Sequence, residues 1–341
     1  MNHFVRLYGD ACAAEGLSMN PAVIERLARA VAEVDAQAPG APLLTLRFDG
    51  LVCGEGDWAA VSAALPGLAL GALSLEESYV GDLGLRAVCR GLASGPALGA
   101  LGVGRQPSPC GLRSLVLKHA ALRDASPLAE ALAACPRLSF LDLSRNRLGV
   151  CAEGVVGLCR ALGVHPGLAA VDLADNLLQG RRGGDVVQAL SELLVRSGRP
   201  ESALRALHLQ DNQLGDYFLI PSTLPGSHPT RWGGLVDREG GAGLGVLCEG
   251  PNGAKLEAAG AVQDAMLPFV PPSALLGAHP FMEALFLNNT LEEFRLEGNG
   301  FPDGLLEWIE AKMRVNRRTR QRYMKEFSAQ NRDELPIVMD T

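Results

Sequence analysis

Aromatic residues are scarce in this sequence of 341 residues: they make up 5% of it, although hydrophobic residues make up 48%. A core of this composition must be built from leucine, alanine and valine. Long apolar runs are absent too, because no window approaches 18 uninterrupted apolar residues. The opening residues, MNHFVRLYGDACAAEGL, contain no apolar segment of the kind found in a secretory signal. We therefore expect a soluble cytoplasmic protein with no membrane partner.

Motifs for metal binding or catalysis are missing as well. The eight cysteines include no Cys-x-x-Cys pair, and the six histidines include no pair three or four residues apart. HExxH and GxSxG do not occur, and neither GGAGLGVLCEG nor GPNGAK matches a nucleotide-binding loop. We expect reduced, mostly buried thiols, no cofactor, no metal and no enzymatic activity.

The charge balance is mildly acidic, with 38 acidic and 31 basic residues and a formal net charge of −7. A general nucleic-acid-binding domain would more often be basic throughout. The balance therefore argues against a nucleic-acid partner.

A repeated segment is the strongest positive signal. LSFLDLSRNRLG, LAAVDLADNLLQ, LRALHLQDNQLG and LEEFRLEGNGFP begin at Leu138, Leu168, Leu204 and Leu291. Each has apolar residues at offsets 0, 3, 5 and 10 and asparagine at offset 8, at Asn146, Asn176, Asn212 and Asn299. Weaker copies begin at Leu43, Leu70 and Leu112, where the asparagine position holds Leu51, Ser78 and Ala120. Four full copies and three degenerate ones predict a repeat architecture.

The spacing also predicts the form of each unit. The LxL core is a short strand whose alternate side chains point inward, and the asparagine amide can satisfy backbone groups where the chain leaves the strand. Between strands, EGVVGLCRALGVHPGL and GDVVQALSELLVRSGRPESAL have apolar residues three and four apart, as in a helix. We expect an α/β fold: a curved solenoid with a parallel sheet on the concave face and helices on the convex face.

These segments resemble the ribonuclease-inhibitor-like leucine-rich repeats, with LDLSRNRLG and LHLQDNQLG as the residues that carry the likeness. The resemblance covers roughly residues 40–215 and 280–315. It implies a horseshoe whose concave face binds another protein. Proteins with such repeats include the ribonuclease inhibitor, the Ran GTPase-activating protein, receptor sensor domains, and many cytoskeletal and ciliary scaffolds.

The repeat also sets the expected division of the chain. We expect an N-terminal helical cap over 1–40, repeats over 41–215, a Gly/Pro-rich insertion over 216–279, a last repeat over 280–302, a cap helix with a basic extension over 303–327 and a tail over 328–341. Asn20 is the expected N-cap of the second helix, with Pro21 at its first position. The insertion is either a flexible segment or a partner-docking element, in which Trp232 would be the aromatic anchor. A further strand-like start at Leu98 is either a truncated repeat or part of a loop.

Charged side chains on the expected concave face are the candidate binding residues. They are Glu76, Glu77, Lys118, Arg145, Asp172, Asp175, His208, Asp211, Arg295 and Glu297. Such a face would steer a basic or mixed-charge protein, unless the charges only keep the sheet solvated. We also expect His208 to lie beside Asp172 and Asp142 of the preceding units, as part of a polar stripe.

The two ends resemble the caps of leucine-rich repeat proteins of cilia and centrosomes. The resemblance rests on Tyr8 and Cys12 near the start, and on Gly298-Asn299 and Asn316-Arg317 near the end. It implies a non-catalytic scaffold or assembly component of an axoneme or basal body, with tubulin or axonemal proteins as partners. The alternatives are a regulator of a small GTPase like the Ran GTPase-activating protein and an innate-immune sensor domain. For the first, Arg47 lies in the first expected strand, but nothing distinguishes it from other charged strand residues.

The segment MRVNRRTRQRYMKEF is basic within an acidic chain. Because residues 316–322 offer no apolar side chain, we expect this part of the last helix to project beyond the array. Basic and aromatic side chains there would suit an acidic protein surface. The residues concerned are Arg317, Arg318, Arg320, Arg322, Tyr323 and Phe327.

Leu141 tests the assignment of the repeat. Each inward aliphatic side chain is expected to contribute about 1.5–3 kcal/mol before conformational entropy is counted. Leu141→Asp should therefore unfold at least its neighbourhood and lower the thermal midpoint, measured by circular dichroism. An unchanged midpoint would refute the assignment.

Overall fold

The computed structural model describes residues 3–35, 44–65, 70–94, 111–178, 184–199, 202–214, 280–301 and 303–330. All structural statements below refer to these residues. The expected strand-like start at Leu98 and the candidate anchor Trp232 lie outside them.

The described chain is an α/β structure with one seven-stranded, fully parallel sheet whose strands follow chain order. The strands are β1 (Leu44–Arg47), β2 (Leu70–Ser74), β3 (Ser114–Val116), β4 (Phe140–Asp142), β5 (Ala170–Asp172), β6 (Ala206–His208) and β7 (Glu293–Arg295). Their central residues pair across the whole sheet: Leu46, Leu73, Leu115, Leu141, Val171, Leu207 and Phe294.

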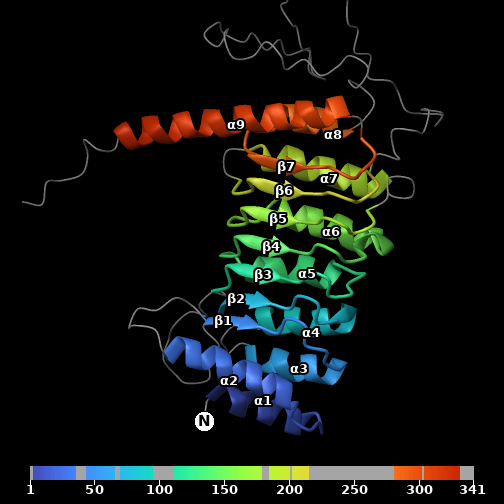
Figure 1. Cartoon of the computed structure of the whole chain (residues 1–341), viewed down its shortest axis with the longest axis vertical. Coiled ribbons are helices and arrows are strands. Elements are labelled where there is room, and N and C mark those ends of the chain that lie inside the picture. The colour runs from blue at the N-terminus through green and yellow to red at the C-terminus, as the bar shows by residue number, and fades with distance from the viewer. Residues whose placement is uncertain are drawn as a thin grey trace, which may run out of the picture.

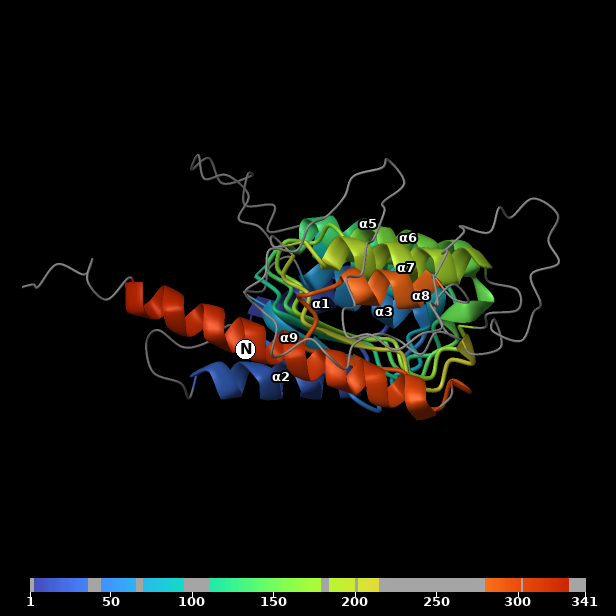
Figure 2. The same cartoon turned by 90° about the horizontal axis from the view of Figure 1, so that it is seen from above.

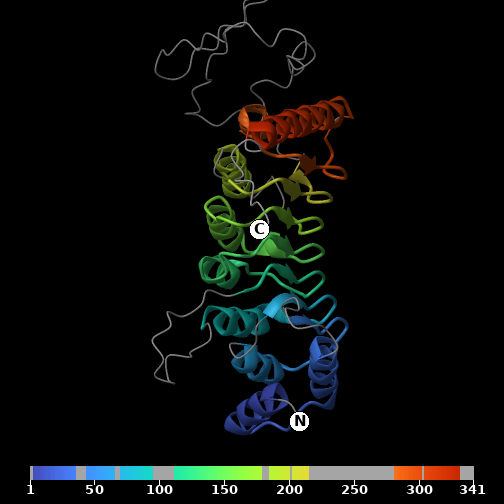
Figure 3. The ribbon, with the colours of Figure 1, turned by 90° about the vertical axis from the view of Figure 1, so that its left-hand side faces the viewer.

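Helices alternate with the strands and cover one face of the sheet. They are α3 (Glu55–Ala64), α4 (Gly81–Ala93), α5 (Ser126–Ala131), α6 (Ala152–Leu162), α7 (Gly184–Ser197) and α8 (Pro280–Leu287). The chain begins with α1 (His3–Ala14) and α2 (Pro21–Asp35) and reaches α9 (Asp303–Gln330) at its other end. Figure 1 shows the elements stacked in chain order along the longest axis, and Figure 3 shows the helices and strands as two layers.

The core lies between these layers and is mostly leucine, as the composition predicts. The central strand residues are each at most 5% exposed, and Leu85, Leu158 and Leu190 face them from helices α4, α6 and α7. Large rings are few: Trp58 and Phe48 form an edge-to-face pair with centroids 5.9 Å apart near the first strand. On the opposite side of the sheet, the described elements include only the end helices α2 and α9, beside β1 and β7 (Figure 2). We call the sheet surface on that side the open face.

A ladder of buried asparagines joins successive units. Asn212 Nδ2 donates to Leu173 O of the preceding unit at 2.8 Å and to Leu209 O of its own unit at 3.0 Å. Its Oδ1 accepts from the backbone N–H groups of Asn176 and Leu178 at 2.8 and 3.3 Å. Asn146 and Asn299 make the equivalent bonds in their own units. The expected role of the asparagine amide is thus confirmed.

The degenerate copies retain only part of this ladder. Ala120 offers no amide of its own, although its backbone N–H donates to Asn146 Oδ1 at 3.0 Å. Ser78 replaces the amide with a hydroxyl that donates to Phe48 O at 2.6 Å. Both side chains are fully buried, so the turn keeps its shape while the number of bonds between units falls.

The predicted N-cap of the second helix is confirmed. Asn20 Oδ1 accepts from the N–H of Ala22 at 3.0 Å, so Asn20 caps α2, which starts at Pro21. The backbone N–H of Asn20 donates to the hydroxyl of Tyr8 at 3.1 Å, which ties the two cap helices together. Helix α2 contacts the edge strand β1, where unpaired backbone groups would otherwise be exposed.

The last helix departs from its prediction. Leu305, Ile309 and Met313 pack on the end of the sheet as expected, but the packing does not stop there. Asn316 is 3% exposed, and its Nδ2 donates to Leu291 O at 2.7 Å and to Asn288 O at 3.1 Å. The prediction that residue 316 belongs to the projecting segment was wrong. That prediction considered only apolar residues. A polar side chain can be buried here because two backbone carbonyls accept its hydrogen bonds.

Asn212→Ala tests the ladder. The substitution removes the acceptor of two buried N–H groups, those of Asn176 and Leu178, and one of the two amide donors to the carbonyls of Leu173 and Leu209. We expect the free energy of unfolding to fall by about 2–4 kcal/mol in urea titrations. Gln188→Ala on the exposed face of α7 is the matched control and should stay within about 0.5 kcal/mol of the parent. Equal losses for both variants would contradict a structural role of the ladder.

Candidate protein-interaction surface

Residues that flank the central position of each strand form the open face. Since successive strand residues alternate between faces, each strand contributes one residue before and one after its buried centre. The first row is Thr45, Ala72, Ser114, Phe140, Ala170, Ala206 and Glu293. The second row is Arg47, Ser74, Val116, Asp142, Asp172, His208 and Arg295.

The ten residues predicted for this face divide among three positions. Asp172, His208 and Arg295 are in the second strand row. Glu76, Lys118 and Glu297 lie two residues beyond the strand ends, and Glu77, Arg145, Asp175 and Asp211 follow them in the turns. The structure therefore arranges the ten residues as a strip along one side of the open face, where the strands end, rather than over the whole of it.

The four turn residues have left-handed backbones, with φ between 52° and 57°. That conformation disfavours residues with a Cβ, so the surrounding structure must hold it. The backbone N–H of each donates to the next unit, for example from Asp175 to Gln210 O and from Asp211 to Glu297 O, both at 2.9 Å. Their side chains are thus displayed from a fixed backbone.

Glu76 and Lys118 form an ion pair between neighbouring units, with Lys118 Nζ 2.6 Å from Glu76 Oε1. The hydrogen bond to Glu76 raises the pKa of Lys118, although desolvation partly opposes it. Both side chains remain about one third exposed. A pair this open contributes little to stability and leaves both charges accessible to a partner.

His208 is the centre of a denser cluster at the C-terminal end of the sheet. Its Nδ1 lies 3.5 Å from Asp172 Oδ2, and its Nε2 lies 3.2 Å from Glu293 Oε1, which also pairs with Arg295. The hydrogen bond to Asp172 raises the pKa of His208. Burial acts to raise the pKa of Asp172, but the bonds from His208 and the Ala174 N–H outweigh it and lower that pKa. The predicted stripe of Asp142, Asp172 and His208 is confirmed by the register of β4, β5 and β6.

Two open-face residues were missed at the level of sequence. Phe140 is 39% exposed in a row of otherwise small or polar side chains, and Glu293 completes the His208 cluster. Both precede an inward residue in the strand, so the period-two alternation alone could have identified them. Phe140 is an exposed aromatic on a flat polar surface, a common type of anchor in protein interfaces.

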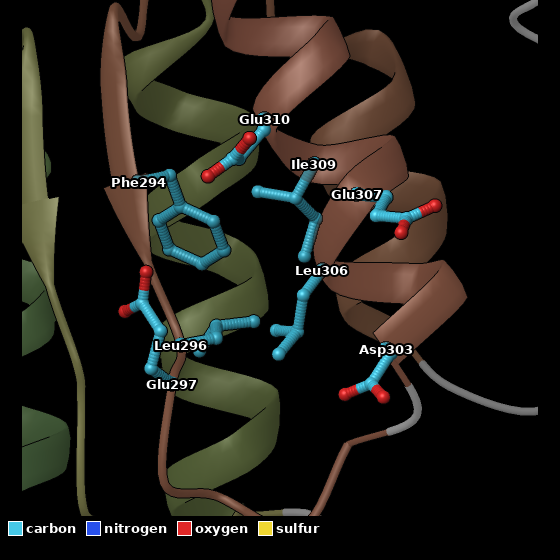
Figure 4. Close-up of a pocket in the computed structure, with 8 residues that line it drawn as sticks. All are labelled: Phe294, Leu296, Glu297, Asp303, Leu306, Glu307, Ile309 and Glu310. Carbon is cyan, nitrogen blue, oxygen red and sulfur yellow. The ribbon is translucent and has the colours of Figure 1, made fainter.

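A pocket of about 260 Å³ lies where α9 crosses β7 (Figure 4). Phe294, Leu296, Leu306 and Ile309 form its apolar lining. The remaining lining residues are acidic: Glu297, Asp303, Glu307 and Glu310. Of these, only Glu297 was among the predicted binding residues.

The predicted basic segment lies on α9. Arg317, Arg318 and Tyr323 are exposed, whereas Arg320 Nη1 pairs with Glu292 Oε1 at 2.9 Å and so contacts the end of the array. Arg322 is also exposed, and the backbone of Phe327 belongs to the helix. On the inner side of α9, burial lowers the pKa of Lys312 to about 8, and its Nζ donates to Asn289 Oδ1 at 2.8 Å.

The described cysteines form no disulfide bond with one another and are mainly buried. Cys12, Cys89, Cys135 and Cys159 are buried, while Cys53 and Cys151 are half-buried. Burial raises the pKa values of Cys53, Cys89 and Cys159 to about 12, so these thiols stay protonated and unreactive at neutral pH. Within the described ranges, no group of three or more His, Cys, Asp or Glu residues could hold a metal ion.

Comparison with known proteins gives no match, either to a family model or to a curated protein sequence. Across the helices that the structure describes, none has the length and apolar character needed to cross a bilayer.

His208→Gln tests the charge cluster. Because the folded-state pKa of His208 is raised, its stabilising contribution is complete below about pH 6.5 and is lost as the pH rises through the folded value. Asp172 is ionised throughout the range from pH 5.5 to 8.5, so it does not confound the comparison. The variant should lose about 1 kcal/mol more stability at pH 5.5 than at pH 8.5 in urea titrations. His119→Gln, at an exposed turn position, is the control, and a loss for His208→Gln that is independent of pH would contradict the assignment.

Proposed function

We propose that the chain is a leucine-rich repeat solenoid of the ribonuclease-inhibitor-like class. Support comes from the agreement between the four full sequence copies and the recurrent strand, asparagine turn and helix that they form. The in-register parallel sheet and the single layer of helices are the arrangement that such repeats require.

Its proposed function is that of a non-catalytic protein-interaction scaffold whose partner lies on the open face. The observation that carries this proposal is the contrast between the two faces. One is closed by helices, while the other presents a polar strip, the His208 cluster and the exposed ring of Phe140. A broad surface with one aromatic anchor and mixed charge is typical of protein recognition.

We further propose that this scaffold works in the cytoskeleton of a cilium or flagellum, at the axoneme or the basal body. Both end motifs that resemble ciliary leucine-rich repeat proteins have structural positions in this chain. Tyr8 and Cys12 are buried in α1, and Asn299 and Asn316 join β7 and α9 to the array. Tubulin or an axonemal protein would be the partner, and the basic part of α9 would face an acidic protein surface.

Retention in detergent-extracted axonemes tests this proposal. A tagged copy in ciliated cells should localise to cilia and remain in the extracted axoneme, whereas a double variant Phe140→Ala/Asp142→Lys should lose at least about tenfold of that retention through loss of the anchor and of charge complementarity. Phe140→Ala removes an exposed ring, whereas Asp142→Lys also removes the bonds that Asp142 Oδ1 accepts from Ser144, so circular dichroism must show that the fold persists in the double variant.

The matched control reverses charge and removes an apolar group on α6 instead, with Val156→Ala/Glu153→Lys. This control should be retained like the parent. A parent protein spread through the soluble cytosol would exclude the ciliary role, and equal retention of all three proteins would exclude the open face as the binding surface.

A further inference from the structure

The exposed charges of α9 are separated along the helix. Its first eight residues carry the exposed acids Asp303, Glu307 and Glu310, whereas the exposed basic residues begin at Arg314. With 3.6 residues per turn, the residues of one helix face recur at spacings of three, four and seven. The basic residues that share the face of these acids are Arg314, Arg317, Arg318 and Lys325. One face of α9 therefore has an acidic half and a basic half.

An apolar feature accompanies each half. The acidic half borders the pocket between α9 and β7, with Leu306 in its lining (Figure 4). The basic half carries Met324, whose side chain is 49% exposed. Leu306 and Met324 are about five helical turns apart and so lie on the same side of α9. The acidic half borders a pocket of about 260 Å³ that has four apolar residues in its otherwise acidic lining, and the basic half carries one exposed apolar side chain.

We propose that two copies of this chain associate through antiparallel contact of their α9 helices. With the twofold axis near Arg314, Glu310 lies opposite Arg318 of the second copy, and Asp303 lies opposite Lys325 of the second copy. Met324 of each copy then lies beside the other's pocket. Each contact occurs twice, as twofold symmetry requires. A parallel arrangement would instead place acid against acid and base against base.

The rest of the structure leaves this face available. The opposite side of α9 is the one that packs on the array, through Leu305, Ile309, Met313 and Asn316. At the axis, Arg314 Nη1 already lies 3.3 Å from Glu310 Oε2 of its own helix, which reduces repulsion between the two Arg314 side chains. The inference rests on the proposed function in one respect. That proposal has the basic part of α9 face an acidic protein surface, and here the surface is the acidic half of α9 in the second copy.

Analytical ultracentrifugation of the purified full chain tests the proposal. In about 50 mM salt the 35.9 kDa chain should sediment as a dimer, and its dissociation constant should rise at least about tenfold in about 500 mM salt, since exposed charge pairs are screened. A parent protein that remains monomeric at tens of micromolar in low salt would overturn the proposal.

Two charge-reversal variants separate pairing from misfolding. Glu307→Arg/Glu310→Arg leaves Asp303 as the one acid named on this face, and Arg317→Glu/Arg318→Glu places two acids in its second half, between Arg314 and Lys325. Each variant alone should be monomeric, because residues 310 and 318 of the two copies then carry charges of the same sign. An equimolar mixture should form a heterodimer, because residues 310 and 318 again carry opposite charges between unlike chains while Asp303 still faces Lys325. Arg137→Glu/Arg160→Glu changes the net charge equally at exposed positions away from α9 and should dimerise like the parent.

Dimers of both single variants, or a mixture that stays monomeric, would overturn the antiparallel contact. These readouts use one purified protein, whereas the proposed function is tested by axonemal retention of open-face variants. A monomeric protein that is retained would therefore refute only the dimer, and a dimeric protein that is not retained would refute only the ciliary scaffold.

Discussion

Burial of the asparagine amide is the constraint on which the rest of this structure depends. A chain that leaves a strand and turns toward a helix must direct backbone carbonyls and N–H groups into an apolar interior, where each unpaired group is costly. Asn212 satisfies such groups in two neighbouring units at once. The amide thereby links the shape of one turn to the position of the next strand. Register, turn geometry and the spacing between units are consequences of the same set of bonds.

The choice of side chains on the open face is less constrained because other residues hold the fold. Because the inward leucines and the buried amides hold most of the fold, the outward strand positions are less constrained, although Asp142 and Asp172 accept hydrogen bonds from the turns that follow their strands. They can therefore hold Asp172, His208 and Glu293 as a partly desolvated cluster, or the exposed ring of Phe140. The same holds for the left-handed turn residues Glu77 and Asp211. Their backbone N–H groups bond the following unit, while their side chains lie along the side of the open face where the strands end.

Features that depend on local spacing were predictable from the sequence, and features that depend on distant partners were not. The LxL spacing predicted all four strands of the full copies, and Asn20 with Pro21 predicted the start of α2, because these signals act within one unit. Asn316 was misplaced because its partners, Asn288 O and Leu291 O, belong to another element. For the His208 cluster, the sequence predicted Asp172 as a neighbour but not Glu293. Glu293 lies 85 residues further along the chain and reaches His208 only through the register of β6 and β7.

The end of the array shows why a polar helix can close an apolar stack. Strand β7 presents both an apolar surface and unpaired backbone groups, and α9 must cover the two together. Leucine and methionine meet the first requirement, while Asn316 contributes to the second by bonding Leu291 O and Asn288 O just before the strand. Lys312 bonds the side-chain oxygen of Asn289. Burial of Lys312 costs stability, as its lowered pKa shows, so the cap is not optimised for packing alone. Because the inner face of α9 is occupied by these contacts, only its outer face can accept different side chains without loss of packing. The acidic and basic halves of α9 lie on that outer face.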